Sequence, residues 1–328
     1  MKRTVKRALS LYLAAVMLFG TLCVASLAAD VESINVTAHE SHIAPIAEDL
    51  TIRTYRGVPV KGEFSAVSTA GEALTFRLAA APKKGTVSID GACFIYTPAD
   101  GKRGKDSFTY TAVDECGNVS GEATVSITIE KQNTDVSYPD VSPEDNPCAA
   151  VMLAEYGIYT GNRIGDCYHF GTDEALTRGE FLAMCMELAD AQPLTEITRT
   201  GFYDDDDMPS WVKPYVSAAL MYGLITGYPN ESGSPVFSAN AGISSFEAAV
   251  MLNNVLGITD VVSVSAFEKA DYAPVWAVQA VANLSSCNII SGLSANPLTR
   301  GEAADMLCAA IQLIEERGRD SSRLSWAE

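Results

Sequence analysis

The chain has 328 residues and a formal net charge of -18, from 23 basic and 41 acidic side chains. So large an excess of acid excludes nucleic acid as a partner, because that partner requires a basic surface. Apolar residues make up 48% of the chain and charged residues 20%, which is typical of a folded protein, and the length is sufficient for two or three domains.

The first 29 residues have the composition of an export signal. The basic pairs Lys2-Arg3 and Lys6-Arg7 precede an apolar run from Ala8 to Leu27, and small residues allow cleavage after Ala28 or Ala29. Retention of this segment as a membrane anchor is the alternative. No later segment reaches the ~20 apolar residues that a spanning helix needs. We therefore expect a secreted chain with no membrane span after cleavage of the signal.

Residues 30–45 are predicted to be a linker, and residues 46–130 to form a β-sandwich. Apolar and polar residues alternate there in short runs, which is the pattern of half-buried strands. Asp90-Gly91 lies between two such runs and predicts a hairpin turn. Glycines separate the other runs at turn spacing. Six or seven short strands in one segment favour a sandwich of two sheets.

The same segment carries a set of specific motifs: Phe94-Ile95-Tyr96-Thr97-Pro98, Gly104-Lys105-Asp106-Ser107-Phe108-Thr109-Tyr110, Asp114 and Gly117-Asn118-Val119-Ser120. Together they resemble the cadherin-like and immunoglobulin-like modules of bacterial surface proteins, over most of residues 44–130. The resemblance implies a spacer or an adhesive module. Some relatives bind Ca²⁺ through acidic loops, so Asp106, Asp114 and Glu115 are candidate ligands. Solvated turn acids are the alternative, and we expect no other cofactor.

Seven cysteines follow the export signal, an odd number that cannot all pair within one chain. None lies in a C-x-x-C pattern, and the three histidines are too scattered to indicate a metal site. Cys93–Cys116 and Cys148–Cys167 are the candidate disulfides. Buried free thiols are the alternative.

A polar linker at residues 131–137 precedes a region of helical periodicity that repeats. The sequence Leu176-Thr177-Arg178-Gly179-Glu180 returns unchanged at residues 298–302, and Ile243-Ser244-Ser245-Phe246-Glu247 keeps its outline. Each unit is predicted to contain a helix, a loop closed by glycine, and a second helix. The predicted boundaries are residues 138–190, 202–257 and 267–317, followed by a polar tail at 318–328.

A hydroxyl residue followed three positions later by glutamate begins each second helix. This spacing predicts a capping box, in which the hydroxyl and the carboxylate satisfy free backbone N–H groups. The three predicted pairs are Thr177 with Glu180, Ser244 with Glu247, and Thr299 with Glu302.

Further motifs recur with these caps: Tyr138-Pro139-Asp140 and Phe202-Tyr203-Asp204, Trp211 and Trp276, Gly157-Ile158 and Gly223-Leu224, and Gly227-Tyr228-Pro229. With the Thr-Arg-x-Glu helix starts, they resemble the S-layer homology (SLH) domain in a set of three, over residues 138–317. The resemblance implies an all-α pseudo-trimer of helix-loop-helix prongs. It also implies non-covalent binding of secondary cell-wall polysaccharide, a peptidoglycan-linked polymer that is often pyruvylated, in grooves between the prongs.

The arginines of the motif, Arg178 and Arg300, are not explained by capping, because the first turn of a helix favours an acid. A cation beside free helix N–H groups suits a carboxylate, such as that of a pyruvate ketal. The alternative is two tolerated surface arginines. We expect replacement by alanine to weaken binding with little effect on the melting temperature. Ser245 replaces the arginine in the middle repeat, so we expect one or two working grooves.

The aromatic residues Trp211, Trp276 and Tyr228 are further candidate sugar-binding residues. The two tryptophans are equally consistent with a role in the core, whereas Tyr228 is predicted to lie in a loop. The acidic run Asp204 to Asp207 is a candidate Ca²⁺ site, with a capping loop as the favoured alternative.

These patterns predict a secreted, non-enzymatic protein of the bacterial cell surface, held on the wall or S-layer by SLH repeats. One alternative is a structural or adhesive protein whose degenerate repeats no longer bind sugar. A wall hydrolase is the less favoured alternative, because the sandwich offers no catalytic pair of residues.

Overall fold

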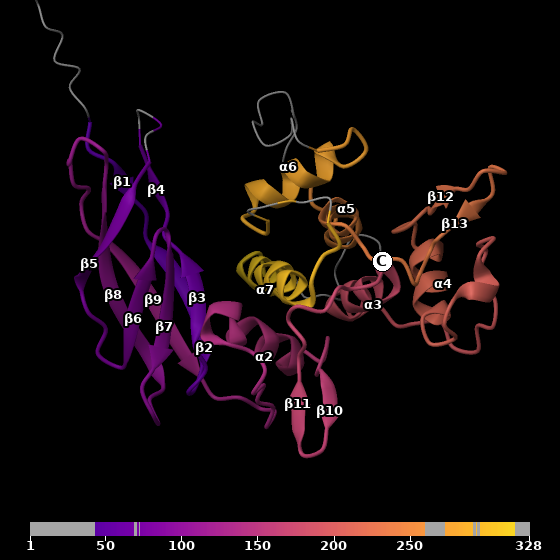
Figure 1. The fold of residues 1–328 in the computed structure, drawn as a ribbon, viewed down its shortest axis with the longest axis horizontal. Helices are drawn as coiled ribbons and strands as arrows, with labels where there is room; N and C mark the ends of the chain where they lie inside the picture. Colours follow the sequence, from indigo (N-terminus) through magenta and orange to yellow (C-terminus); the bar gives the residue numbers. More distant parts are fainter. Residues whose placement is uncertain are drawn as a thin grey trace, which may run out of the picture. The chain divides into compact units, whose positions relative to one another are not determined.

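The computed structural model describes residues 43–68, 71, 73–259, 273–290, 293 and 296–318. The predicted export signal, most of the first linker and nearly all of the polar tail lie outside the described residues. From Ile43 onward the chain forms one unit, with strands in its N-terminal part and helices in its C-terminal part (Figure 1).

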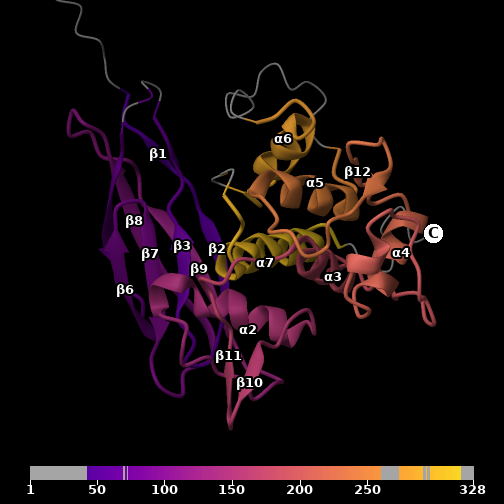
Figure 2. The ribbon, with the colours of Figure 1, turned by 45° about the vertical axis from the view of Figure 1, so that its right-hand side comes forward.

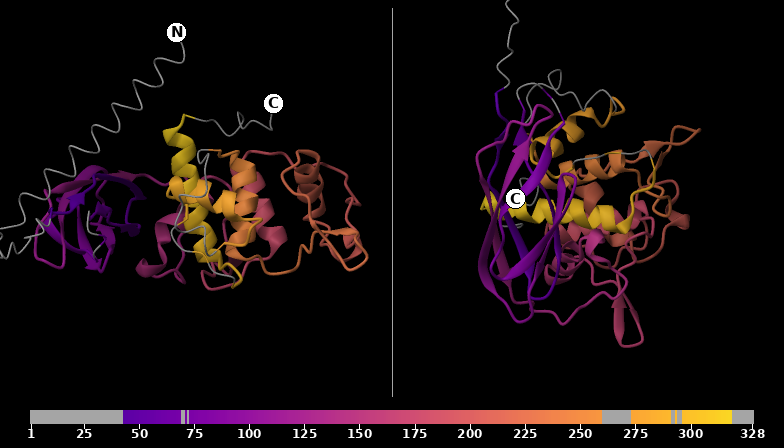
Figure 3. Two further views of the ribbon diagram at one scale, coloured as in Figure 1. Left: turned by 90° about the horizontal axis from the view of Figure 1, so that it is seen from above. Right: turned by 60° about the vertical axis from the view of Figure 1, so that its left-hand side comes forward.

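The N-terminal strands form a sandwich, as the alternating pattern predicts. One sheet has the order β2-β9-β8-β5 and the other β3-β7-β6, while β1 and β4 pair separately. Strands β2 and β9 run parallel, and the other pairs are antiparallel. The bounds are β1 Ile46–Ala47, β2 Leu50–Tyr55, β3 Val60–Glu63, β4 Ala66–Val67, β5 Thr75–Ala80, β6 Gly85–Asp90, β7 Cys93–Pro98, β8 Gly104–Val113 and β9 Ala123–Glu130. Figure 3 shows these strands in indigo and purple.

Aromatic side chains fill the space between the two sheets. Phe94 and Phe108 are almost fully buried, and their ring centroids lie 5.3 Å apart. Phe64 lies 4.8 Å from Phe94 and 4.4 Å from the ring of Tyr110. The buried Tyr110 hydroxyl donates at 2.7 Å to the carbonyl oxygen of Ser65, so its polar end is satisfied inside the core.

The turn acids of the sandwich are engaged with the protein itself. The Asp106 carboxylate accepts hydrogen bonds from the backbone N–H groups of Lys83 and Lys84 and from the Tyr96 hydroxyl. Asp114 accepts from the backbone and side chain of Asn118. Among the described residues, no group of three or more potential ligands could hold a metal ion. These contacts give the turn acids a structural use, and Ca²⁺ binding stays a prediction.

Among the described residues that follow the sandwich there are six α-helices, and none of them is both long and apolar enough to cross a membrane. Two short hairpins lie in the loops between helices. The helix bounds are α2 Pro147–Glu155, α3 Arg178–Leu188, α4 Lys213–Met221, α5 Ser245–Leu256, α6 Val278–Ser286 and α7 Arg300–Glu316. The hairpins are β10 Asn162–Ile164 with β11 Cys167–His169, and β12 Tyr228–Pro229 with β13 Pro235–Val236. Short 3-10 helices cover η1 Pro143–Asp145 and η2 Asp205–Asp207.

The helices pair across the predicted repeats. Among the described residues, the close pairs are α2 with α7, α4 with α3, and α6 with α5, and α3 also lies against α5 and α7 (Figure 2). The first helix of each repeat therefore packs on the second helix of another repeat. This differs from the expected prongs made of one helix-loop-helix each. A nine-residue first helix has too little surface to form a core with its own partner, and a long loop separates the two.

A closed ring of backbone hydrogen bonds joins the starts of the three second helices. The N–H of Leu176 donates to the carbonyl oxygen of Leu298, Leu298 donates to Ile243, and Ile243 donates back to Leu176, at 2.7–3.0 Å. All three side chains are buried, at 2% exposure or less. The apolar residue that precedes each cap therefore lies at a common centre, and α3, α5 and α7 begin around it.

Helix α2 is buried along almost its whole length, from Cys148 to Ala154. It packs against α7 and also against strand β3 of the sandwich. The Cys148 thiol donates at 3.3 Å to the carbonyl oxygen of Arg53, and the Arg53 guanidinium binds Glu315 of α7 at 3.1 Å. A helix that is apolar on every face requires such a cover.

Neither candidate disulfide, Cys93–Cys116 nor Cys148–Cys167, is present among the described residues. Cys148 is buried in α2, whereas Cys167 is exposed in β11. Cys93 is the first residue of β7, directly after the β6–β7 turn, and Cys116 is exposed in the turn after β8. Burial raises the pKa of the Cys148 thiol to about 12. This thiol therefore behaves as a small buried apolar group, because the reactive thiolate is strongly disfavoured.

Candidate functional site

All three second helices begin with a capping box. The side chains of Thr177, Ser244 and Thr299 each accept a hydrogen bond from the backbone N–H three residues later. The glutamates at those positions, Glu180, Glu247 and Glu302, reach back to the N–H of the capping residue. The hydroxyl and the glutamate of the repeated motif are therefore occupied by the helix itself.

At α3 and α7, the N–H groups of the first two helical residues are also occupied. Arg178 N donates to Ala241 O and Gly179 N to Ala239 O, both at 2.9 Å. The same arrangement recurs at α7, where Arg300 N donates to Glu174 O at 2.8 Å. The expectation of free N–H groups beside the arginines is therefore wrong. The loop before one capped helix crosses the start of another, and its carbonyl oxygens take these donors.

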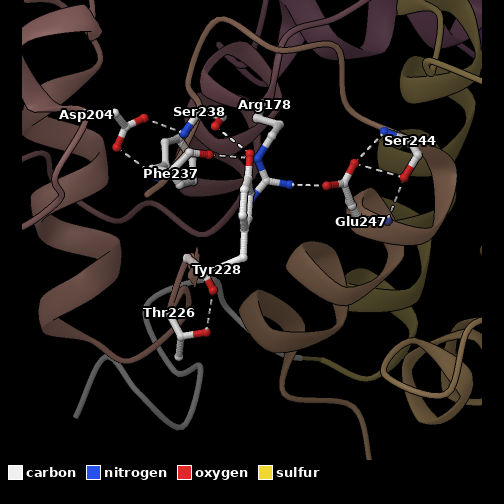
Figure 4. Close-up of polar contacts among 9 residues, drawn as sticks. Arg178, Asp204, Thr226, Tyr228, Phe237, Ser238, Ser244 and Glu247 are labelled. Carbon is white, nitrogen blue, oxygen red and sulfur yellow. Dashed lines mark hydrogen bonds and ion pairs between the residues drawn. The ribbon is translucent and has the colours of Figure 1, made fainter. Parts of the chain in front are cut away.

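Arg178 is buried at 8% exposure and reaches from α3 into the second repeat (Figure 4). Its Nε donates to the carbonyl oxygen of Phe237 at 2.9 Å, and Nη1 binds Oε1 of Glu247 at 2.8 Å. The guanidinium carbon lies 5.6 Å from the ring centre of Tyr228 and 5.2 Å from that of Phe237, within the range of cation–π attraction. The alternative of a tolerated surface arginine is therefore wrong.

The aromatic-x-Asp motif holds the loop that Arg178 contacts. The Asp204 carboxylate accepts from the N–H groups of Phe237 and Ser238, at 2.9 and 2.7 Å (Figure 4). Asp140 accepts in the same way from Phe170 and Gly171, at 3.2 and 2.8 Å. Each aspartate thus holds a loop in place, and the carbonyl oxygen of the phenylalanine in that loop accepts a hydrogen bond from an arginine. This gives Asp204 a structural use, as the capping-loop alternative for the acidic run predicts.

Arg300 is buried at 5% exposure and reaches from α7 into the first repeat. Its Nη1 donates to the carbonyl oxygen of Phe170 at 2.8 Å and binds Oε2 of Glu174 at 2.7 Å. The guanidinium carbon lies 5.2 Å from the ring centre of Tyr159. Nε is buried without a hydrogen-bond partner, and the described residues provide none for Nη2. This guanidinium therefore keeps donors that the protein does not use.

A pocket of about 340 Å³ opens beside Arg300. Apart from Arg300, its polar and aromatic lining consists of Tyr159, Glu180, Glu187, Trp211 and Tyr215. The Tyr215 hydroxyl donates to Glu187 at 2.6 Å, and burial together with this carboxylate raises the pKa of Tyr215 to about 12. The pocket thus combines one guanidinium and aromatic surface with two carboxylates, each of which already accepts a hydrogen bond from the protein, Glu180 from Thr177 and Glu187 from Tyr215. An anionic group of a ligand would have to bind at the guanidinium, and an apolar face would lie on the aromatic surface.

The structure brings some of the predicted binding residues together. Trp211 and Arg300 line the same pocket, and Tyr228 lies against Arg178. The tryptophans are not core residues, since Trp211 is 50% and Trp276 59% exposed. Ser245 is buried at the first position of α5, and its short side chain cannot reach across as the arginines do.

Sequence reasoning missed Tyr159, Glu174 and Tyr215. Tyr159 and Glu174 contact Arg300, while Tyr215 lines the same pocket. These residues belong to the site because of contacts between different repeats, and the spacing of residues within a motif does not predict such contacts. The parallel between Phe170-Gly171 and Phe237-Ser238 in the two loops was the available signal.

Comparison with protein families identifies two segments. Residues 42–128 match the bacterial Ig domain, and residues 201–249 match the S-layer homology domain. The first match covers the sandwich. The second covers α4, the β12–β13 hairpin and the start of α5. Among curated proteins, no sequence matches this chain significantly.

Several solved structures share a local likeness with the chain. An endo-fucoidan hydrolase of glycoside hydrolase family 107 is 20% identical with a TM-score of 0.23, over 27% of this chain. The chain spans 14% of that hydrolase and 15% of a related structure of the same enzyme. The SrpA adhesin of Streptococcus sanguinis is 19% identical with a TM-score of 0.23, over 38% of this chain and 83% of the adhesin.

These likenesses are too low to support an argument about activity, so the family matches carry the conclusion. An SLH domain binds cell-wall polymers and indicates a protein attached at the cell surface. The chain therefore contains one segment similar to the bacterial Ig domain and one similar to the S-layer homology domain, and the second match supports cell-wall anchoring in general.

Proposed function

We propose that the three helix pairs are three SLH repeats, and that they anchor the secreted chain non-covalently to secondary cell-wall polysaccharide. The bound group is a sugar that carries a carboxylate, such as a pyruvate ketal. Two findings support extending the single matched repeat to three. The capping boxes recur at α3, α5 and α7, and the backbone ring joins Leu176, Ile243 and Leu298.

The observation that carries the proposal is the joint presence of Arg300 and Trp211 in one pocket. Nε of Arg300 is buried and Nη1 is engaged, but Nη2 has no partner among the described residues and can donate a charge-assisted hydrogen bond to a carboxylate. Half-exposed Trp211 offers a flat apolar surface for a sugar ring. Because the molecule as a whole is strongly acidic, a local cation is needed to hold an anionic polymer.

We propose that Arg178 and Tyr228 form a second binding site, the Arg178 groove. Nε and Nη1 of Arg178 are engaged, whereas the described residues give Nη2 no partner. Tyr228 is 42% exposed, so one part of its ring is open to a ligand while another faces the arginine. Ser245 leaves the third groove without a cation, so we propose two working sites.

Binding of this kind is reversible and involves no catalysis. The Ig-like sandwich then acts as a spacer or an adhesive module that the repeats display on the wall. A surface protein with degenerate repeats is the alternative. It predicts a folded chain that does not bind walls.

The test is a binding isotherm of the full chain on purified walls that retain their secondary polymer and on walls stripped of it. We expect saturable binding to the first preparation and none to the second. Equal binding to both preparations would contradict the proposal, and so would the absence of binding to either.

Two variants connect the binding to the pocket. Trp211→Ala should weaken binding about tenfold or more, since stacking on an aromatic ring is lost, whereas Trp211→Phe should keep much of it. Because Trp211 is half exposed, neither variant should unfold the protein, which circular dichroism checks. Unchanged binding by Trp211→Ala would remove the pocket from the proposal.

A further inference from the structure

Glu174 distinguishes the Arg300 groove from the Arg178 groove. Its backbone carbonyl accepts from Arg300 N, as Ala241 O accepts from Arg178 N, so Glu174 and Ala241 occupy equivalent places in the two loops. The first repeat therefore carries a carboxylate where the second has a methyl group. This carboxylate binds Nη1 of Arg300 at 2.7 Å.

Among the described residues, the Glu174 side chain has no other hydrogen bond or ion pair. It is 61% exposed, while the Arg300 side chain is 6% exposed. Glu247, the partner of Arg178, differs because its other oxygen accepts from the backbone and hydroxyl of Ser244. Glu247 is thus part of a helix cap, whereas Glu174 serves only as a counter-ion for Arg300.

The loop is shaped for this ion pair. Gly171 has a φ of +71°, and a Cβ atom there would lie 2.6 Å from Nη1 of Arg300 and 2.8 Å from Cδ of Glu174. Glycine at this position leaves space for both charged groups against the backbone. The equivalent Ser238 of the second repeat has a side chain, and no carboxylate approaches Arg178 from that loop.

We propose that Glu174 is an intramolecular competitor for the carboxylate of the ligand at Arg300, and that it sets the affinity of this groove for an anionic sugar. The inference rests on the proposed function. Glu174 binds Nη1 from outside the lining of the pocket, so a ligand carboxylate that approaches Arg300 from the pocket shares the guanidinium with a second negative charge. This sharing reduces the net gain from binding an anion and does not affect a neutral sugar. Glu174 is therefore a specificity-determining residue of this groove.

The test compares Glu174→Ala, which copies the second repeat, with the unmodified full chain on walls that retain their polymer. We expect binding to tighten by about threefold to tenfold, with a steeper decrease as salt is added, because an unpaired guanidinium attracts the anion more strongly. Glu174→Gln, which keeps the shape of the side chain, should tighten binding similarly. Asp173→Ala removes a neighbouring exposed charge and should leave binding unchanged.

Two further variants separate a local effect from general charge. In an Arg300→Ala background, Glu174→Ala should give no gain. In the second groove, Ala241→Glu should weaken the binding that depends on Arg178. Tighter binding in the Arg300→Ala background, or unchanged or weaker binding by both Glu174 variants, would overturn the inference while leaving the proposed function intact. If the unmodified chain does not bind walls at all, the proposed function itself is wrong, and the inference fails with it.

Discussion

Arg178 and Arg300 lie in the same five-residue motif, at residues 176–180 and 298–302, but their side chains contact different partners. Arg178 pairs with Glu247, a capping residue of α5, and lies against two aromatic rings. Arg300 pairs with the exposed Glu174 of a loop and lies against Tyr159. An identical local sequence therefore fixes the start of the helix and leaves the partners of the arginine open. Those partners come from another repeat, where the sequences have diverged.

The two ion pairs, Arg178–Glu247 and Arg300–Glu174, also differ in how much they are expected to contribute to stability and to ligand binding. Glu247 is 29% exposed and belongs to a cap, so its ion pair with Arg178 is tied into the helical core. Glu174 is more exposed, and its ion pair with Arg300 is more open to solvent. A pair screened by water contributes less to stability than a buried one. We therefore expect Arg178 to matter more for folding, and Arg300 to respond more to ligand.

The largest expected effect is on stability when each arginine is replaced by alanine. Arg178→Ala should lower the free energy of unfolding by about 2–4 kcal/mol, because it strands a partly buried carboxylate and a carbonyl oxygen. Arg300→Ala should cost about 1–2 kcal/mol, since Glu174 can be hydrated. Urea denaturation measures both. These values replace the expectation of little change in melting temperature, which assumed exposed side chains. Equal costs for the two variants would remove the distinction between the grooves.

The stability losses expected for the capping glutamates Glu302 and Glu247 test the same difference between the two ion pairs. Glu302→Ala should cost about 1 kcal/mol, the usual value of a lost cap. Glu247→Ala should cost about 1–2 kcal/mol more, because it also leaves the buried Arg178 without its counter-ion. Thermal unfolding of the two variants under identical conditions tests this. A similar loss in both would show that the Arg178–Glu247 pair adds nothing beyond the cap.

Lowering the pH should destabilise the loop before α4, which contains Asp205. Burial alone raises the pKa of Asp205, but hydrogen bonds from Thr200 and Lys213 outweigh it and hold the pKa at about 2, below the ordinary 3.8. A depressed pKa stabilises the fold above pH 3.8, and this contribution is lost as the pH falls toward 2. Asp205→Asn should therefore lower the melting temperature at pH 7 and have little effect near pH 2.

Asp206 is the matched control for that experiment, because its side chain is 93% exposed. Asp206→Asn should leave the melting temperature unchanged at both pH values. If the two variants behave alike at pH 7, the Asp205 contacts do not stabilise the loop.

The smallest expected effect is that of Ser245→Ala. The exchange removes one hydroxyl from a buried position that carries no charge, so stability should change by no more than about 0.5 kcal/mol and wall binding should not change. Isotherms on intact walls measure the second quantity. A clear loss of binding would show that the third groove takes part in recognition without an arginine.

Local sequence alone predicted the sandwich and the starts of the second helices, but not the hairpins β10–β11 and β12–β13. Alternation of apolar residues predicted the sandwich, and the hydroxyl-x-x-Glu spacing predicted the helix starts that the structure shows at Thr177, Ser244 and Thr299. These features depend on residues a few positions apart, so short-range sequence patterns are sufficient to predict them.

Only the tertiary structure decided how the repeats share their parts. It paired first helices with second helices of other repeats, filled the N–H groups of Arg178 and Gly179 with loop carbonyls, and gave each arginine a different acid. These outcomes depend on contacts between residues about 30 to 160 positions apart, whose geometry follows from packing rather than from local spacing. The repeated motif therefore determined that each arginine lies at the first position of its helix, and the tertiary fold determined which groups each arginine contacts.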